Sequence, residues 1–489
     1  MLSRYCLGLA LTAALACAGP GPALAQEARS AAATQAAQPL IDDFLRAVNG
    51  DASARADFMT RRVAANPRMP RAEIAALLDT IARTSGGLTV QSWQERTRLR
   101  LTVAAKTGKT ARIDLAQDPA DPTRLLGLIP VAMPAPYPEA APPAALSRQA
   151  LTAAIDRRVQ FAAQRDDFSG VVLVMKGDAV VYSRLVGEAD KAAHQPVSLE
   201  TRFNLGSMGK QFTAVAIGQL IEQGKLGLDT RLIDVLPDYP NPDAARKITI
   251  RQLLSHQAGL GMLFERKGWN WKLRYETMGE LLPLFARAPL AFEPGTQAAY
   301  SNEGFIVLGA VVEKLSGQTW YDYVQKNVFD RAGMTHTGSL TDDPAIPDRA
   351  VGYRFGEDDP LGFGARRPNW DTLSRRGNSC GGQYSTAGDM IRFLQALRAG
   401  RLLKPETAAL LVAHTDGGLA DYGLGFQHID LPNGRAVVGH DGGGPSSGIN
   451  SDAKMIWQTG YAYAVLGNYD APFAQTVGRD IGEILALQD

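Results

Sequence analysis

The stretch NLGSMGKQFTAVAIGQLIEQGKLGL, residues 204–228, combines the pattern of a buried helix with a charged side chain. Its apolar residues recur at helical spacing and cover more than one side, which predicts a helix that is largely buried. Lys210 falls in the first turn, three residues after Ser207. Because residues three apart on a helix share a face, the amine and the hydroxyl are expected to meet. A buried ammonium is costly without polar partners, so this lysine needs partners elsewhere in the chain.

Length and composition limit the possible classes of protein. The chain has 489 residues, more than one ordinary core holds, so two or more domains are expected. Its 51 lysines and arginines balance 50 aspartates and glutamates, so neither nucleic acid nor electrostatic membrane attachment is expected. The six histidines show no metal-binding spacing. We therefore expect neither a metal nor another cofactor.

Residues 1–25 are predicted to form a signal peptide. Arg4 precedes an apolar run, Leu7–Ala18, and Ala23-Leu24-Ala25 is a small-x-small cleavage site. The run is too short to span a bilayer, and no later segment reaches the roughly 18 apolar residues that a span needs, so no integral membrane segment is expected. A periplasmic or secreted protein is predicted, with lipid attachment at Cys17 as the alternative.

A proline-rich linker separates two predicted domains. A small α+β accessory domain is predicted for residues 26–132, from helical patterns followed by alternating strands at 98–103 and 111–115. The stretch PVAMPAPYPEAAPP (130–143) marks the boundary. Its proline density favours an extended, semi-rigid spacer over residues 133–145.

The second predicted domain, residues 146–489, has strand patterns near both of its ends. The predicted elements there are an opening helix at Ala150–Arg165, strands at Gly170–Met175, Ala179–Arg184, Lys454–Ile456 and Tyr461–Leu466, and a closing helix from Phe473. They bracket a long helical middle. We predict an α/β (α+β) fold in which one antiparallel sheet, built from both ends of the domain, is flanked by helices beside a helical subdomain.

Two further motifs strengthen the Ser-x-x-Lys pattern, which alone is expected about once by chance in a chain of this length. Tyr300-Ser301-Asn302 follows a Pro-Gly turn and precedes an apolar helical pattern, so its side chains can project from a loop into a cleft. His440-Asp441-Gly442-Gly443-Gly444 follows an apolar strand, and glycines there expose backbone N–H groups to a ligand. Taken singly, each motif is equally well explained as an ordinary turn.

In this order the three motifs resemble those of the serine β-lactamase and penicillin-binding-protein superfamily, in its branch of class C enzymes, D-alanyl peptidases and esterases. The flanks resemble it too, in ITIRQLLSHQAGL (248–260), FEPGTQAAYSNEGF (292–305) and GGQYSTAGDMIRF (381–393). The resemblance covers roughly residues 151–487. It implies a β-lactamase/transpeptidase-like fold.

The resemblance also implies a role for each motif residue. Ser207 would be the nucleophile, with Lys210 as its base or as the group that positions one. Tyr300 would be a shared acid/base that hands a proton to the leaving group. Asn302 would bind the lysine and the flank of the substrate.

The glycine-rich motif would bind the substrate from the strand side. The N–H groups of Ser207 and Gly443 would form an oxyanion hole, and Gly442 would belong to the same binding surface. His440 would face the substrate tail and the tyrosine. With its ordinary pKa of about 6.5, this histidine would become charged as the pH falls towards 6 and would then favour substrates that carry a carboxylate.

The expected function is a serine hydrolase that cleaves an ester or a D-amino-acid-type amide through an acyl-enzyme. The third motif, which is Lys/His-Thr/x-Gly in the family, is His-Asp-Gly here rather than Lys-Thr-Gly, and this departure argues against efficient β-lactamase activity. A weak class C-like β-lactamase and a non-catalytic penicillin-binding sensor are the alternatives. The expected partner is therefore a small-molecule ester, a peptide or a β-lactam.

Several other residues have plainer interpretations. Trp269 and Trp271 could line the acyl pocket or belong to the core, and His256 is expected to be structural, at the end of a helix. Arg375-Arg376 could bind a substrate carboxylate, although a solvated pair is the simpler interpretation. Cys380 is expected to be a lone buried thiol, because it is the only cysteine left after signal cleavage.

Overall fold

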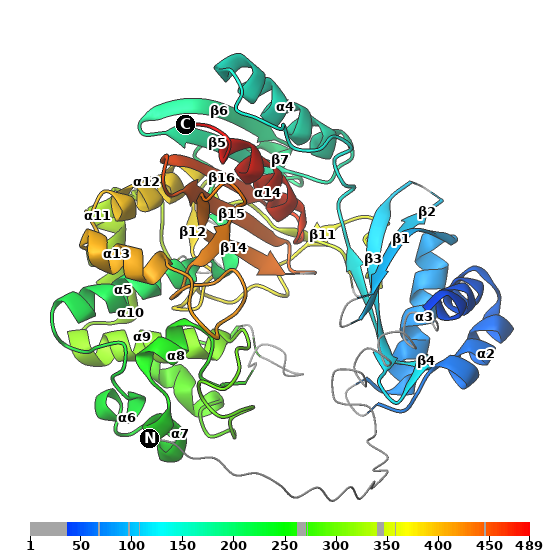
Figure 1. The fold of residues 1–489 in the computed structure, drawn as a ribbon, viewed down its shortest axis with the longest axis horizontal. Coiled ribbons are helices and arrows are strands. Elements are labelled where there is room, and N and C mark those ends of the chain that lie inside the picture. The colour runs from blue at the N-terminus through cyan, green and yellow to red at the C-terminus, as the bar shows by residue number, and fades with distance from the viewer. Residues whose placement is uncertain are drawn as a thin grey trace, which may run out of the picture. The chain divides into compact units, whose positions relative to one another are not determined.

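The computed structural model describes residues 37–489 except 67–68, 96–97, 107, 262–269, 271, 340–346, 357 and 445. The predicted signal peptide, Trp269 and Trp271 therefore lie outside the described residues. The chain divides into two compact units (Figure 1). One is made of residues up to Gly108 with Arg112–Pro130, and the other of Val131–Asp489 with Lys109–Ala111.

The first unit is a helical segment followed by a four-stranded sheet. Its elements are a helix over 37–49, α2 (Ala52–Arg62), α3 (Arg71–Ser85), β1 (Leu88–Glu95), β2 (Leu99–Ala105), β3 (Thr110–Asp118) and β4 (Asp121–Ala132). The strands lie in the order β1-β2-β3-β4. Asp51 caps α2 by accepting from the N–H of Ala54, and α3 ends at Gly86 with a φ of 60°. The two strands predicted from the alternating pattern correspond to β2 and β3, while β1 and β4 were not predicted.

The second unit is built on a six-stranded sheet in the order β13-β14-β15-β16-β5-β6. The strands are β5 (Gly170–Lys176), β6 (Ala179–Val186), β13 (Gln427–Asp430), β14 (Ala436–Gly444), β15 (Ile449–Ile456) and β16 (Tyr461–Gly467). All neighbouring pairs are antiparallel. Because β16 pairs with β5, the two ends of the unit form one sheet, as the sequence predicts.

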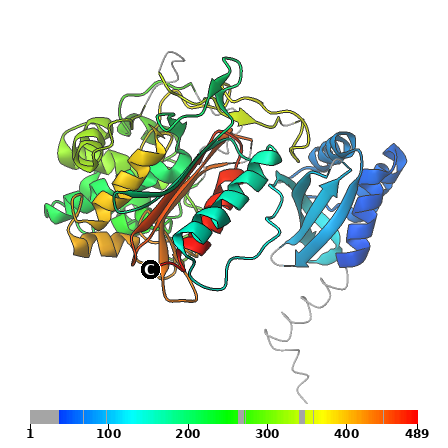
Figure 2. The same ribbon diagram turned by 90° about the horizontal axis from the view of Figure 1, so that it is seen from above.

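Helices cover both faces of this sheet (Figure 2). On one face lie α4 (Arg148–Gln164) and α14 (Phe473–Leu485), which pack together, and on the other lies α12 (Ala387–Arg398). The alternation along β5 serves both layers: Val172 and Val174 pack with α4 and α14, while Val171 and Leu173 join the larger core on the other face. This arrangement confirms the predicted fold class.

The helical subdomain lies between the two halves of the sheet in the sequence. It comprises α5 (Lys210–Glu222), α6 (Leu232–Val235), α7 (Pro242–Lys247), α8 (Ile250–Leu254), α9 (Asn302–Ser316), α10 (Trp320–Val324), α11 (Asp330–Ala332) and α13 (Pro405–Val412). Short strands accompany it: β7 (Glu188–Asp190), β8 (Gln195–Pro196), β9 (Phe203–Asn204), β10 (Tyr353–Arg354), β11 (Arg367–Pro368) and β12 (Tyr384–Ser385). A capping box at Thr249 and Gln252 starts α8.

The proline-rich segment after β4 contains neither helix nor strand, but it packs on α4. The Tyr137 ring meets that of Phe161 edge to face at 5.5 Å, and the guanidinium of Arg158 lies 4.5 Å from the Tyr137 ring centroid. Arg158 also donates to the carbonyl of Ala140 at 3.2 Å. This part of the predicted spacer is therefore attached to the second unit.

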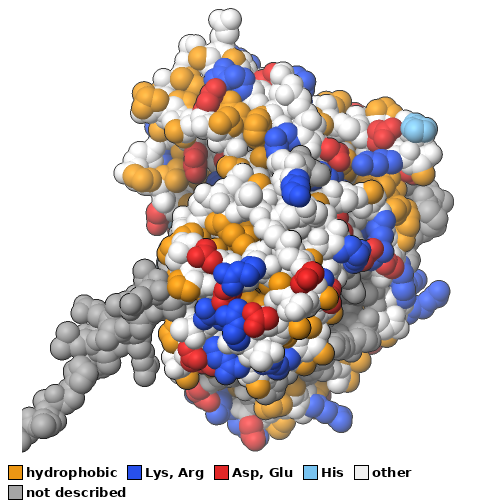
Figure 3. Space-filling view, turned by 90° about the vertical axis from the view of Figure 1, so that its right-hand side faces the viewer, with side chains coloured by type: hydrophobic (Ala, Val, Ile, Leu, Met, Phe, Trp, Pro, Cys, Tyr) orange, Lys and Arg blue, Asp and Glu red, His pale blue; other side chains and the backbone are white. Residues whose placement is uncertain are grey.

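Figure 3 and the described helices bear on whether the protein has a strongly charged face or a membrane-spanning helix. On the face drawn in Figure 3, basic and acidic side chains lie interspersed. In the first unit, for example, Arg46, Arg61 and Arg62 all pair with Asp43. None of the helices among the described residues has the length and apolar character needed to cross a bilayer.

Candidate active site

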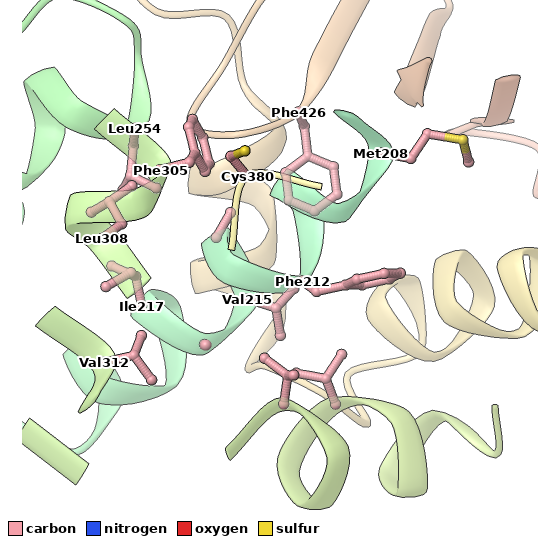
Figure 4. Close-up of a cluster of buried hydrophobic side chains, with 14 of the residues drawn as sticks. Met208, Phe212, Val215, Ile217, Leu254, Phe305, Leu308, Val312, Cys380 and Phe426 are labelled. Carbon is pink, nitrogen blue, oxygen red and sulfur yellow. The ribbon is translucent and has the colours of Figure 1, made fainter. Parts of the chain in front are cut away.

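Ser207 and Lys210 lie where a short turn passes into a buried helix. Ser207 belongs to a 3₁₀ turn, Gly206–Gly209, and Lys210 opens α5. Residues 210–220 of α5 are all buried, as expected for a helix that is apolar on every side. In Figure 4, Ile217 of α5 lies beside Leu308 and Val312 of α9. This packing fixes the position of the turn that carries the serine.

The ammonium of Lys210 has three hydrogen-bond acceptors although its residue is fully buried. Nζ lies 3.1 Å from Ser207 Oγ, 2.7 Å from Asn302 Oδ1 and 2.8 Å from the Cys380 carbonyl oxygen. These contacts offset the free-energy cost of removing the ammonium from water, because each of its protons has an acceptor. All three acceptors are neutral, and a neutral oxygen holds an ammonium proton less tightly than a carboxylate does. The amine is therefore placed to exchange a proton with Ser207.

The Tyr-Ser-Asn motif leads into α9, which crosses α5. Asn302 is the first residue of α9, and Ser301 caps the helix by accepting from the N–H of Gly304 at 3.2 Å. The half-buried Tyr300 precedes the cap, and its ring centroid lies 4.8 Å from Lys210 Nζ. The structure thus brings Ser207, Lys210, Tyr300 and Asn302 together.

Strand β14 approaches the serine turn through glycines. A Cβ on Gly206, whose φ is +52°, would lie 2.5 Å from the nitrogen of Gly443. A Cβ on Gly442 would lie 1.9 Å from the carbonyl oxygen of Leu205 and 2.8 Å from the nitrogen of Ser207. Side chains at these positions are excluded by the close contact of the two backbones. The sequence suggested a strand that ends before the glycines, but β14 continues through Gly444, paired with β15.

A cavity of about 250 Å³ opens at the serine. Ser207, Asn302 and Gly443 lie on its wall, together with residues of the segment between Thr372 and Tyr384. A carbonyl carbon placed at Ser207 Oγ would thus lie beside the backbone of β14. The N–H groups of Ser207 and Gly443 remain the predicted oxyanion hole.

The model of the β-lactamase family matches residues 154–486, which is more than half of the chain. The chain belongs to the β-lactamase family. This confirms the superfamily predicted from the three motifs.

Individual relatives of this β-lactamase-family protein have several named activities. Penicillin-binding protein 4* of Bacillus subtilis is 28% identical over 298 residues, which are 58% of this chain and 64% of that protein. The alignment thus spans less than two thirds of the relative's own length. Esterase EstB of Burkholderia gladioli is 32% identical over 270 residues, 49% of this chain and 68% of its own.

Solved structures share the fold. The crystal structure of a penicillin binding protein from Bacillus halodurans covers 68% of this chain and 98% of its own, with a TM-score of 0.59 and 31% identity. A D-amino acid amidase from Ochrobactrum anthropi, at 22% identity and a TM-score of 0.58, covers 69% of this chain and 98% of its own and shows the fold alone.

His440 occupies the place of the lysine in the third motif of the β-lactamase family, but it is buried. It is 1% exposed, its Nε2 lies 3.0 Å from the Tyr422 hydroxyl, and its Nδ1 contacts the Asp441 carbonyl. Since a carbonyl only accepts, Nδ1 carries the proton and Tyr422 donates to Nε2. Burial, outweighing the nearby Asp441, lowers the pKa of His440 to about 4. The expectation that it becomes charged towards pH 6 is therefore wrong, and it does not line the cavity at Ser207.

His256 supports the Tyr300 loop from behind. It follows α8 with a φ of +62° and is 2% exposed. Its Nδ1 accepts from the N–H of Ser301 at 3.0 Å, its carbonyl accepts from the N–H of Ala299 at 2.9 Å, and its ring lies 4.4 Å from that of Tyr300. The sequence interpretation of a structural histidine missed this link to Tyr300, although LLSHQAGL was among the matching flanks.

Cys380 contributes its backbone rather than its thiol. The thiol is buried and free, and burial raises its pKa to about 11. Its carbonyl is one of the three acceptors of Lys210, a role for which the residue type gives no signal. Arg376, by contrast, donates to the Ser339 carbonyl, lies 3.5 Å from Glu276 and stacks on Tyr321. That guanidinium is thus occupied away from the serine.

Proposed function

We propose that this protein is a serine hydrolase that cleaves an ester or a D-amino-acid-type amide through an acyl-enzyme on Ser207. The observation that carries the proposal is the buried Lys210, whose Nζ lies 3.1 Å from Ser207 Oγ and 2.7 Å from Asn302. A nucleophilic serine needs such a neighbouring base at neutral pH. Relatives named as an esterase and a D-aminopeptidase support the reaction class.

In the proposed reaction Lys210 first releases one proton to solvent. Ser207 Oγ then attacks the substrate carbonyl and gives its proton to the free Nζ. The N–H groups of Ser207 and Gly443 bind the oxyanion. Tyr300 passes a proton to the leaving group as its bond to the carbonyl carbon breaks, and takes over from Lys210 the proton that came from Ser207. Water then attacks the acyl-enzyme and gives a proton to Lys210, and as the ester bond breaks that proton goes to Ser207 Oγ and the acid is released.

A penicillin-binding sensor is the less supported alternative. A sensor needs only the acylation of its serine. Here Ser207 has Lys210 as a base and Tyr300 as a proton donor, and these two groups can serve both acylation and deacylation. The buried neutral His440 presents no permanent charge to a carboxylate, which favours at most weak turnover of β-lactams.

We also propose a periplasmic or secreted location. The support is the sequence of residues 1–25, in which Arg4, the apolar run and Ala23-Leu24-Ala25 have the order of a cleavable signal. Fractionation of cells followed by N-terminal sequencing would test it, with Gln26 as the expected first residue. A lipid-linked N-terminus at Cys17 would favour the alternative.

A fluorophosphonate probe tests the nucleophile. The wild type should be labelled at one serine, Ser207, and Ser207→Ala should abolish the labelling. Ser446→Ala is the matched control, since that serine lies in a nucleophile-elbow-like sequence but should remain unlabelled. Labelling that survives in Ser207→Ala, or that maps to Ser446, contradicts the proposal. Turnover of esters, D-Ala-D-Ala peptides and β-lactams then gives the substrate class.

A further inference from the structure

The cavity at Ser207 has a neutral wall. The described residues that line it are glycines, residues with hydroxyl or amide side chains, one cysteine and two aliphatic residues, and none of them carries a charge. Thr372, Ser374, Asn378, Ser447, Leu373 and Ile449 are among them. An ionised group placed there would lose hydration without gaining a counter-ion.

Four charged residues adjoin lining residues in the sequence, namely Glu303, Asp371, Arg375 and Arg376, and none of their side chains lines the cavity. Arg376 is held by Ser339 and Glu276. Of the two arginines, Arg375 is therefore the one left to meet a substrate carboxylate, and an experiment can address it directly.

Charged side chains gather instead in a second cavity, of about 540 Å³, that Tyr300 lines. Asp421, Asp441, Lys454 and Arg479 lie on its wall. Tyr300, which protonates the leaving group in the proposed reaction, faces this cavity and does not line the one at Ser207. The leaving group therefore belongs on the Tyr300 side, and the acyl group in the neutral cavity.

We propose that the enzyme selects substrates with an uncharged acyl group of small size. This rests on the proposed function, because it takes Ser207 as the nucleophile and Tyr300 as the proton donor. A cavity of about 150 Å³ admits benzene, so about 250 Å³ accommodates a short chain or a single ring. Hydroxyl and amide groups on the wall can bind a neutral carbonyl or amide of that acyl group.

The test compares three p-nitrophenyl esters that share a leaving group and differ in the charge of the acyl chain: the pentanoate, the hemiglutarate and the 4-(trimethylammonio)butyrate. Rates in Ser207→Ala are subtracted as background. We expect kcat/KM for the pentanoate to exceed that for each charged ester by about 100-fold, because an unpaired ion in a partly enclosed site costs several kcal/mol. Equal kcat/KM for the neutral and the charged esters would overturn the inference.

Variants locate the effect. Ser374→Lys places an ammonium on the wall and should raise the hemiglutarate-to-pentanoate ratio by about tenfold or more, whereas Ser183→Lys, on the exposed strand β6, should leave it unchanged. If the wild type prefers the hemiglutarate and Arg375→Gln removes that preference, Arg375 supplies a carboxylate site and the inference is wrong. If Ser207 is labelled but the charged esters react equally well, only this inference fails; if Ser207 is not labelled, the proposed function fails with it.

Discussion

Replacing His256 by alanine should reduce kcat more than a core substitution elsewhere that lowers the free energy of unfolding by a similar amount. Its carbonyl and its Nδ1 accept from the residues on both sides of Tyr300, at 2.9 Å from Ala299 N and 3.0 Å from Ser301 N, and its ring lies against the tyrosine. Three contacts thus fix the backbone and the ring of Tyr300, the proposed proton donor. Nδ1 accepts only in the neutral imidazole, and burial, followed by the charge of Lys210, lowers the pKa of His256 well below its usual value.

The size of the effect follows from what His256→Ala removes. Ser301 is 3% exposed, so its N–H would be left without a partner, at a cost of about 1–3 kcal/mol. Loss of the aromatic contact with Tyr300 adds about 0.5–1.5 kcal/mol. The free energy of unfolding should therefore fall by about 1.5–4.5 kcal/mol. If Tyr300 loses about 1.4 kcal/mol of transition-state stabilisation through misplacement, kcat falls about tenfold.

The assay measures kcat and KM with a p-nitrophenyl ester, together with urea unfolding, for three variants. His256→Asn keeps an acceptor and tolerates the left-handed backbone, so it should recover part of kcat. Ile481→Ala, in the core on the other face of the sheet, should cost about 2–5 kcal/mol of stability but leave kcat near that of the wild type. A His256→Ala protein that is destabilised yet keeps kcat within twofold would refute the positioning role.

Other predictions concern His440, a buried ion pair and the linker. With its pKa at about 4, His440 stays neutral from pH 5.5 to 8.5, so the ratio of kcat/KM for a cephalosporin to that for a neutral ester should be flat, and an inflection near pH 6 would refute this. Asp452→Asn leaves the ammonium of Lys454 buried without its partner and should lower the free energy of unfolding by about 3–5 kcal/mol in urea titrations at pH 8. A chain beginning at Val131 should fold and keep the nucleophile reactive to the fluorophosphonate, whereas one beginning at Ala145, which lacks the ring packed on α4, should melt at a lower temperature.

Much of the fold could be predicted because hydrophobic spacing determines which face of an element is buried. The apolar run of β5 predicted a buried strand, and the apolar residues on more than one side of α5 predicted a buried helix. The strand patterns at both ends of the second unit predicted one shared sheet. Strands β1 and β4 were not predicted, because polar and apolar residues do not strictly alternate in their sequences, for example in TVQSWQE of β1 and DPTRLL of β4. Their pairing in the sheet depends on neighbours that a single segment does not reveal.

The sequence could predict which motif residues lie together at the candidate site, because side-chain chemistry and spacing point to them. It could not predict the backbone of the site. The carbonyl of Cys380 contacts Lys210 from 170 residues away, and nothing about a cysteine indicates that its carbonyl is an acceptor. The sequence also could not predict how deeply a side chain is buried. It identifies His440 as a titratable group. The structure shows that this residue is 1% exposed and packed against Tyr422, and this burial lowers its pKa so that it does not titrate near neutral pH.

The neutral state of His440 and the neutral cavity point to the same mode of recognition. Tyr422 donates to Nε2 and the Asp441 carbonyl accepts from Nδ1, so both ring nitrogens of the neutral imidazole have partners in a position that is 1% exposed. The ammonium of Lys210 already has three acceptors. Neither group is thus available as a fixed positive charge for a substrate carboxylate. Substrate selection in the cavity must then rest on shape and on hydrogen bonds to neutral groups, which are weaker than ion pairs and suit an acyl group that has to leave after each turnover.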